Sequence, residues 1–158
     1  MIGKPYPCLW FNMQAEQAAQ PYASVFPKTR ILETARYPDA MPDLAGQVLT
    51  VTLDLNGQNF MLLNGGPEFT FSEAVSFVVD CETQAEVDHL WNQLTDDGGE
   101  ESMCGWLKDR FGVSWQIVPT ALGEMMADPD PVKVNRVTQA MLQMRKLDVA
   151  TLRAAYNG

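Results

Sequence analysis

Apolar and polar residues follow one another in two stretches that share the same order of patterns. Each stretch opens with a short apolar run, at residues 5–11 and again at residues 74–79. Each run is followed by a segment in which apolar residues recur at helical spacing, and then by segments in which they alternate as on a strand. This repeated order of strand, helix and three strands predicts two βαβββ modules within one chain.

The first module is predicted to contain one helix and three further strands. Its helix covers residues 13–26, with Asn12 as the residue that caps the first turn. Pro21 lies inside this helix and predicts a kink or a restart, because proline removes a backbone hydrogen bond. The pair Asn56-Gly57 is a strong signal for a hairpin between the last two strands. The strands are predicted over residues 29–37, 47–55 and 58–64.

The second module repeats this order with different residues. Its helix is predicted over residues 82–94, with Asp80 as the cap and an apolar stripe that faces the core. A turn at residues 97–99 separates this helix from a strand over residues 101–108. A last strand covers residues 113–119.

A helical tail is predicted after the second module. The sequence DPDP at residues 128–131 suits the start of a helix, because proline is favoured in a first turn. Asp148 caps a short final helix that ends at Tyr156. The apolar faces of both helices need a partner, which is either a second subunit or the back of the chain's own sheet. The expected organisation is a single domain, 1–158, with modules at 5–67 and 73–120 and a C-terminal helical extension at 129–157.

The composition is that of an ordinary globular chain with an acidic balance. Hydrophobic residues make up 46% of the 158 residues and charged residues 20%, and the formal net charge is −9. This charge repels a phosphate backbone, so nucleic acid is not expected as a partner. The apolar runs are shorter than the roughly 20 residues that a membrane helix needs, so no membrane is expected either.

Two features predict a cytoplasmic protein. The N-terminal residues lack the basic leader and the apolar stretch of a signal peptide. Cys8, Cys81 and Cys104 are odd in number and widely spaced, which favours reduced thiols over a disulfide framework or a metal pair. We expect them to act as small hydrophobic residues rather than as reactive nucleophiles.

Alternation along the predicted strands sorts their side chains onto two faces. One face is apolar and must pack against the helices. It carries Leu9, Phe11, Leu49, Val51, Leu53, Met61, Leu63, Val75, Phe77, Val79, Val113, Trp115 and Ile117. The opposite face mixes aromatic with neutral polar side chains, as ligand cavities do. It carries Cys8, Trp10, Thr50, Thr52, Phe60, Leu62, Asn64, Ser76, Val78, Ser114 and Gln116.

We expect this second face to hold a small-molecule cavity. The side chains predicted to line it are Trp10, Thr50, Thr52, Asn64, Ser76, Trp106 and Gln116. The alternative is that the polar groups only satisfy one another or water, and that the two tryptophans only pack. In either case the face offers no paired carboxylates, no nucleophile beside a base and no cluster with metal-ligand spacing.

The other chemical candidates are interpreted as structural residues. His89 lies out of phase with the apolar stripe of its helix and is expected on the surface. Asp109 begins the sequence DRFG, which favours a turn with a hydrogen-bonding aspartate over an acid catalyst. The glycine pairs at 65–66 and 98–99 lack the spacing of a phosphate-binding loop and are interpreted as turns.

Four segments carry the motifs of a known family. They read PCLWFNMQAEQAAQPYASVFPKTRI, GQVLTVTLDLNGQNFMLLNGGPEFTF, ETQAEVD and CGWLKDRFGVSWQIVPT. Together they resemble the PhnB-like family of the vicinal-oxygen-chelate superfamily, often labelled 3-demethylubiquinone-9 3-methyltransferase. The resemblance covers residues 5–158 and implies an α+β fold of the glyoxalase and bleomycin-resistance type. In that fold two βαβββ modules form a curved mixed sheet, here with C-terminal helices added, and the protein is usually a homodimer.

The resemblance also bears on metals and on the reaction. Members of the superfamily often hold a divalent metal with one residue from the first and last strand of each half. In this sequence those positions fall near Tyr6, Leu62, Ala74 and Gln116. None of them is His, Asp or Glu, so no metal and no cofactor are expected. The implied fold is not the usual one for methyl transfer, which leaves the methyltransferase label without support.

Three functions stay open at this point. The first is a binding protein that sequesters or senses a small, largely apolar or aromatic molecule. The second is an enzyme that acts on such a molecule, with Asn64 and Gln116 polarising it and Cys104 supplying a thiol. The third is a structural dimer with a vestigial pocket.

Overall fold

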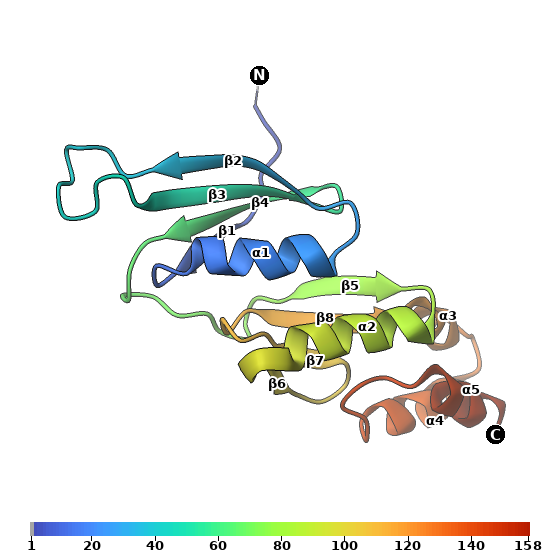
Figure 1. Ribbon diagram of the computed structural model, residues 1–158. Coiled ribbons are helices and arrows are strands. Elements are labelled where there is room, and N and C mark those ends of the chain that lie inside the picture. The colour runs from blue at the N-terminus through green and yellow to red at the C-terminus, as the bar shows by residue number, and fades with distance from the viewer. Residues whose placement is uncertain (1) are drawn as a thin grey trace. The chain divides into compact units, whose positions relative to one another are not determined.

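The computed structural model describes residues 2–158, which form two compact units. One unit ends at Phe71 and the other spans Ser72–Gly158. Each unit contains one four-stranded sheet and one helix that packs on it, and the second unit also holds the C-terminal helices (Figure 1).

The first unit is a βαβββ module, as the sequence predicts. Its strands are β1 Cys8–Phe11, β2 Arg30–Arg36, β3 Val48–Leu55 and β4 Gln58–Asn64. They lie in the order β1-β4-β3-β2, with β1 parallel to β4 and the other neighbours antiparallel. Helix α1, Ala15–Val25, runs along one face of this sheet (Figure 1).

Helix α1 can be compared with its prediction at Pro21 and at its N-terminus. Of the two alternatives predicted at Pro21, a kink or a restart, the restart does not occur, because one helix runs through this residue. The helix begins at Ala15 with Gln14 as the N-cap, and the expected cap at Asn12 is therefore wrong. Met13 has a φ of 58°, and this left-handed backbone separates Asn12 from the first turn. The buried stripe of Ala18, Tyr22 and their neighbours faces the sheet as predicted.

The second unit repeats the βαβββ order. Its strands are β5 Phe77–Cys81, β6 Glu100–Glu101, β7 Trp106–Lys108 and β8 Ser114–Pro119, in the order β5-β8-β7-β6. Strand β5 is parallel to β8, and the other neighbours are antiparallel. The strand predicted over residues 101–108 is divided into β6 and β7, because Cys104 and Gly105 turn the chain with positive φ angles of 59° and 83°.

Helix α2, Gln84–Thr95, packs on this sheet and is followed by a short 3₁₀ turn, Asp96–Gly98. Its N-cap is Thr83 and not the predicted Asp80. The Thr83 hydroxyl accepts a hydrogen bond from the Glu86 backbone N–H, and the Glu86 carboxylate accepts one from the Thr83 N–H. This reciprocal capping box fixes where the helix begins.

The C-terminal tail forms three helices with a core of their own. They are α3 Thr120–Met126, α4 Pro131–Met141 and α5 Val149–Asn157. The core of this cluster contains Ala121, Leu122, Met125, Val137, Leu147 and Leu152. The helices predicted after DPDP and Asp148 are confirmed, with Asp130 and Asp148 as N-caps, whereas α3 lies outside the predicted elements.

The tail is attached to its own module through helix α2. The Gln84 side chain donates to the Leu147 carbonyl at 3.1 Å and accepts from the Val149 N–H at 2.8 Å. The buried cluster of the tail thus lies within the second unit, while Met126, Val132 and Leu142 stay exposed. None of the helices in residues 2–158 has the length and hydropathy needed to cross a membrane.

Candidate functional site

The strand register of the first sheet decides which side chains share a face. The two-residue loop Asn56-Gly57 pairs Leu55 with Gln58, so odd-numbered residues of β3 lie opposite even-numbered residues of β4. The face opposite α1 therefore carries Cys8, Trp10, Thr50, Thr52, Met61 and Leu63. The bounds of β4 agree with the prediction, but its two faces are predicted the wrong way round. Phe60, Leu62 and Asn64 lie on the helix-covered face.

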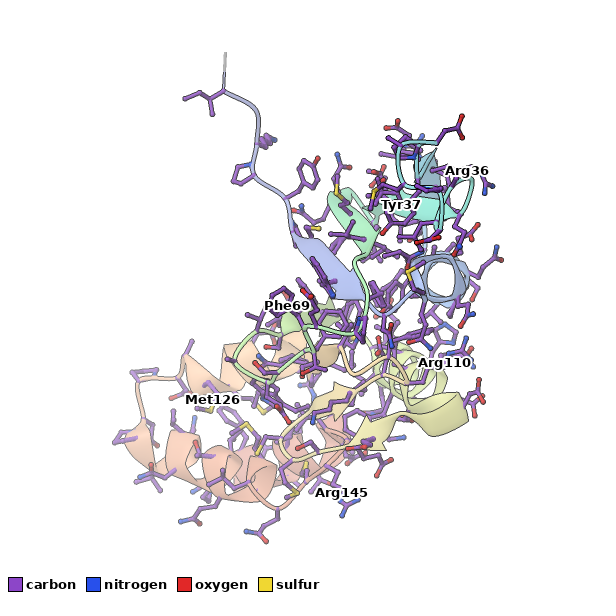
Figure 2. All side chains as sticks on the ribbon, turned by 90° about the vertical axis from the view of Figure 1, so that its left-hand side faces the viewer. Arg36, Tyr37, Phe69, Arg110, Met126 and Arg145 are labelled. Carbon is purple, nitrogen blue, oxygen red and sulfur yellow. The ribbon has the colours of Figure 1, made fainter. Side chains whose placement is uncertain are left out.

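Asn64 is a structural residue of the first module. Its side-chain Oδ1 accepts from the Ala15 N–H at 2.8 Å, and its Nδ2 donates to the Val48 carbonyl at 2.9 Å. The hydroxyl of Tyr37, labelled in Figure 2, donates to the Asn64 backbone carbonyl. Asn64 is only 4% exposed, and its amide is committed to the fold. This corrects the expectation that Asn64 lines a ligand cavity or polarises a substrate.

Trp10 packs beneath the loop that follows β4. Its indole N–H donates to the Gly66 carbonyl at 2.9 Å, and its ring meets Phe69 edge-on with 5.0 Å between centroids. A Cβ on Gly65 would lie 2.3 Å from the indole ring, so only glycine fits there. These contacts fasten the Trp10 ring to the loop, and Trp10, Thr50 and Thr52 are all half-buried on the same face.

The second sheet brings three predicted site residues together on the face opposite α2. Trp106 lies opposite Gln116 in the ladder, and Lys108 lies opposite Ser114. The Gln116 amide donates to the Ser76 hydroxyl at 2.9 Å. Trp106, Gln116 and Ser76 thus share one surface. The alternation of the strands predicts this for Ser76 and Gln116, and the β7–β8 ladder adds Trp106.

A cavity of about 180 Å³ opens on this side of the second sheet. It is lined by Glu73, Glu100, Glu101, Ser102, Trp106, Leu107, Lys108 and Ser114. Ser114 is only 2% exposed, and its hydroxyl Oγ has no hydrogen-bond partner among the described residues. A buried hydroxyl without a partner is rare in folded proteins, because leaving it unsatisfied costs free energy.

One ion pair stands at the edge of this cavity. The Lys108 ammonium contacts the Glu73 carboxylate directly. Their hydrogen bond raises the pKa of Lys108 above its ordinary value of 10.5 and lowers the pKa of Glu73 below its ordinary value of 4.5. Lys108 is therefore a cation, and Glu73 an anion, at neutral pH. The sequence pattern does not identify this pair, because Glu73 lies in the segment before β5.

The Lys108–Glu73 ion pair is expected to make the stability of the protein depend on pH. Replacing Lys108 by methionine is expected to lower the melting temperature modestly between pH 4.5 and pH 10.5. The stabilisation by Glu73 is lost as the pH falls through its lowered pKa, and that by Lys108 is lost as the pH rises through its raised pKa. Thermal melts of the native protein and the variant across pH measure the difference. Glu73→Gln should give the same profile, and a difference that stays constant down to pH 2 would contradict this account.

A larger hollow of about 490 Å³ lies at the β3–β4 hairpin of the first module. It is lined by Lys28, Thr29, Arg30, Asp54, Asn56 and Gly57. Its main charges are already paired, since Arg30 binds Asp54 at 2.8 Å and thereby lowers the pKa of Asp54. It has no aromatic or aliphatic side chain in its lining, so it suits an organic ligand less well than the smaller cavity.

The remaining chemical candidates have structural surroundings. The Asp109 carboxylate accepts from the backbone N–H groups of Phe111 and Val113 and from the Trp115 indole, which confirms its predicted role in a turn. His89 is exposed, as expected. Burial, followed by the charges of Glu86 and Asp80, raises the pKa of Cys81 to about 11, so this thiol stays protonated.

The four positions at which the superfamily often holds a divalent metal do not fit one here. Leu62 is fully buried on the helix-covered face and has no donor atom, and the Gln116 amide is bonded to Ser76. Tyr6 and Ala74 lie before their strands begin. Within residues 2–158 there is also no group of three His, Cys, Asp or Glu side chains that could hold a metal ion. The donor set therefore does not match a glyoxalase-type metal centre.

Known proteins share this arrangement of modules. A family model described as 3-demethylubiquinone-9 3-methyltransferase matches residues 3–118. A PhnB protein from Bacillus cereus with the same methyltransferase label is 36% identical, with a TM-score of 0.67 over 74% of this chain and 99% of its own. A protein from Pseudomonas aeruginosa is 21% identical, with a TM-score of 0.58 over 75% of this chain and 98% of its own.

The fold extends to more distant structures. A Bacillus cereus protein described as a possible glyoxalase is 14% identical, with a TM-score of 0.50 over 75% of this chain and 99% of its own. No curated protein matches the chain. The predicted α+β fold, with two βαβββ modules of the glyoxalase and bleomycin-resistance type, is confirmed.

Proposed function

This chain belongs to the family described as 3-demethylubiquinone-9 3-methyltransferase, a PhnB-like branch of the vicinal-oxygen-chelate superfamily, and on that premise we propose that it binds a small organic molecule. The binding site is the cavity between Trp106 and Ser114 on the second sheet. Its volume of about 180 Å³ suits a molecule smaller than a typical drug, with an apolar or aromatic part and one hydrogen-bonding group.

The observation that carries this proposal is the buried Ser114 hydroxyl. This hydroxyl is 2% exposed and unpartnered among the described residues, and a bound acceptor or donor would satisfy it. The Thr29 hydroxyl of the larger hollow is also unpartnered, but it lies among charged side chains and not beside an aromatic ring. The half-buried Trp106 ring beside it offers apolar area and a flat surface for stacking. Gln116, fixed by Ser76, extends the same polar row along β8.

The methyltransferase label of the family supplies probe molecules but no mechanism. A quinol is a small aromatic with hydroxyl groups, which is the kind of ligand the cavity favours. Both modules have sheet orders unlike the doubly wound parallel sheet that binds nucleotide-like cofactors in a crevice. Binding is therefore proposed here without methyl transfer.

The test compares stability with binding in the variant Ser114→Ala. Without ligand, the variant should be as stable as the native protein or more stable by about 1 kcal/mol, because it removes an unsatisfied buried group. Binding of hydroquinone, phenol, indole, 2-phenylethanol or 2-phenylethylamine should weaken by about tenfold for the compounds that the native protein binds. Thermal melts measure the first quantity, and isothermal titration calorimetry measures the second.

Two controls complete this test. Trp106→Phe should weaken binding, while Trp10→Phe on the other module should leave binding unchanged. If Ser114→Ala strongly destabilised the ligand-free protein, its hydroxyl would be part of the fold. If none of the compounds bound at millimolar concentration, the proposed site would be refuted.

We also propose that the protein is a homodimer, as the family resemblance implies, and that it works in the cytoplasm. Cys8, Cys81 and Cys104 are all free thiols, which suits a reducing compartment.

A further inference from the structure

We infer that the ligand of this cavity carries a positively charged nitrogen, such as a primary or methylated ammonium group. This inference rests on the proposed binding site and adds the charge of the molecule that it takes. It is drawn from the charges around the cavity, from the Trp106 ring and from the Ser114 hydroxyl.

Carboxylates outnumber cations in the cavity lining. Glu73, Glu100 and Glu101 stand against a single ammonium group, that of Lys108. Lys108 and Glu73 neutralise each other through their direct contact. Glu101 is held by the Trp91 indole at 2.8 Å and by Arg145, labelled in Figure 2, whose Nη1 lies 3.6 Å from its Oε2. The negative charge of Glu100 is therefore not balanced by any further cation of the cavity lining.

Glu100 is placed to act on a ligand in the cavity. It lies opposite Lys108 in the β6–β7 ladder, and its charge contributes to the raised pKa of Lys108. Its own side chain is exposed on an edge strand. An incoming anion would face this carboxylate, whereas an incoming cation would be attracted to it.

The aromatic ring and the hydroxyl match the same kind of ligand. A tryptophan face attracts organic cations through its quadrupole, more strongly than other aromatic side chains do. Trp106 is the half-buried tryptophan of the cavity lining. The Ser114 oxygen can accept a hydrogen bond from an ammonium N–H, which would supply the partner that it lacks. The acidic residues alone would not indicate a ligand, but the unpartnered buried hydroxyl among them does.

The experiment compares three compounds of nearly equal size and different charge. They are 2-phenylethylamine, 2-phenylethanol and 3-phenylpropionate, titrated into the 158-residue chain by calorimetry. The amine should bind about tenfold more tightly than the alcohol, and the carboxylate should bind more weakly than both. Raising the salt concentration should reduce the advantage of the amine, because exposed charges are screened.

The variant Glu100→Gln should reduce the preference for the amine about threefold and leave binding of the alcohol unchanged. Glu124→Gln is the matched control, because it makes the same charge change at an exposed position of α3, outside the cavity lining. Equal affinity for amine and alcohol would overturn the inference and leave the proposed site standing. If the amine failed to bind while other compounds bound, the positively charged ligand would be refuted and the binding site would stand. If no compound bound, the ligand charge and the binding site would both be refuted.

Discussion

Replacing Asn64 by alanine is expected to lower the free energy of unfolding by about 3 kcal/mol. The variant leaves the Ala15 N–H and the Val48 carbonyl without their side-chain partners in a buried place. Helix α1 has no other side-chain cap, so its first turn loses the group that holds it. Urea unfolding followed by circular dichroism measures this loss.

The matched control for this prediction is Asn59→Ala on the same strand. Asn59 is exposed in β4, so its substitution should cost less than about 0.5 kcal/mol. A loss below 1 kcal/mol for Asn64→Ala would show that the amide does not fasten α1 to β3, and it would reopen the predicted role of Asn64 in ligand binding.

Replacing Asp109 by alanine is expected to cost about 3 to 4 kcal/mol. The carboxylate accepts hydrogen bonds from two backbone N–H groups at 2.9 and 3.0 Å and from the Trp115 indole at 3.0 Å. Asp109 is only 5% exposed, so water cannot readily replace these bonds. The turn between β7 and β8 would loosen, and with it the ladder that aligns Lys108 with Ser114.

Two further variants separate this effect from a general loss of charge. Asp109→Asn keeps one carbonyl oxygen and should lose less stability than alanine, while Asp39→Ala, at an exposed loop position, should change stability by less than about 0.5 kcal/mol. Equal effects of Asp109→Ala and Asp39→Ala would contradict the role assigned to the buried carboxylate.

The order of elements could be predicted because it depends on local periodicity. Both βαβββ patterns and the helices after DPDP and Asp148 follow from apolar spacing and from residues that favour helix starts. The N-cap residues of α1 and α2 were harder to predict from the sequence. Asn12 and Asp80 are good capping residues, but Thr83 has Glu86 three residues later, and this spacing is the stronger signal.

The faces of β4 could not be assigned from its own alternation. Both faces of this strand carry apolar residues, so the pattern does not say which one meets α1. The register across the hairpin decides it, and the two-residue loop Asn56-Gly57 fixes that register. A two-residue loop places the even-numbered residues of β4 on the same face as Val51 and Leu53. Asn64 therefore lies on the face that α1 covers and not in the candidate site.

The site on the second sheet could be predicted in part. Alternation within β8 groups Ser114 with Gln116, and the ladder adds Trp106. The unpartnered state of the Ser114 hydroxyl and the contact between Glu73 and Lys108 depend on three-dimensional packing between distant segments. No spacing in the sequence encodes either of them.

The most direct test of the binding site is a nuclear magnetic resonance titration that follows the four tryptophan indole N–H signals. The indoles of Trp10, Trp91 and Trp115 donate within their own modules, to Gly66, Glu101 and Asp109. With the tightest-binding compound of the panel, the Trp106 indole and the backbone amides of Ser114 and Gln116 should shift most. Largest shifts at Trp10, or no shifts at saturating compound, would contradict a small-molecule site on the second sheet.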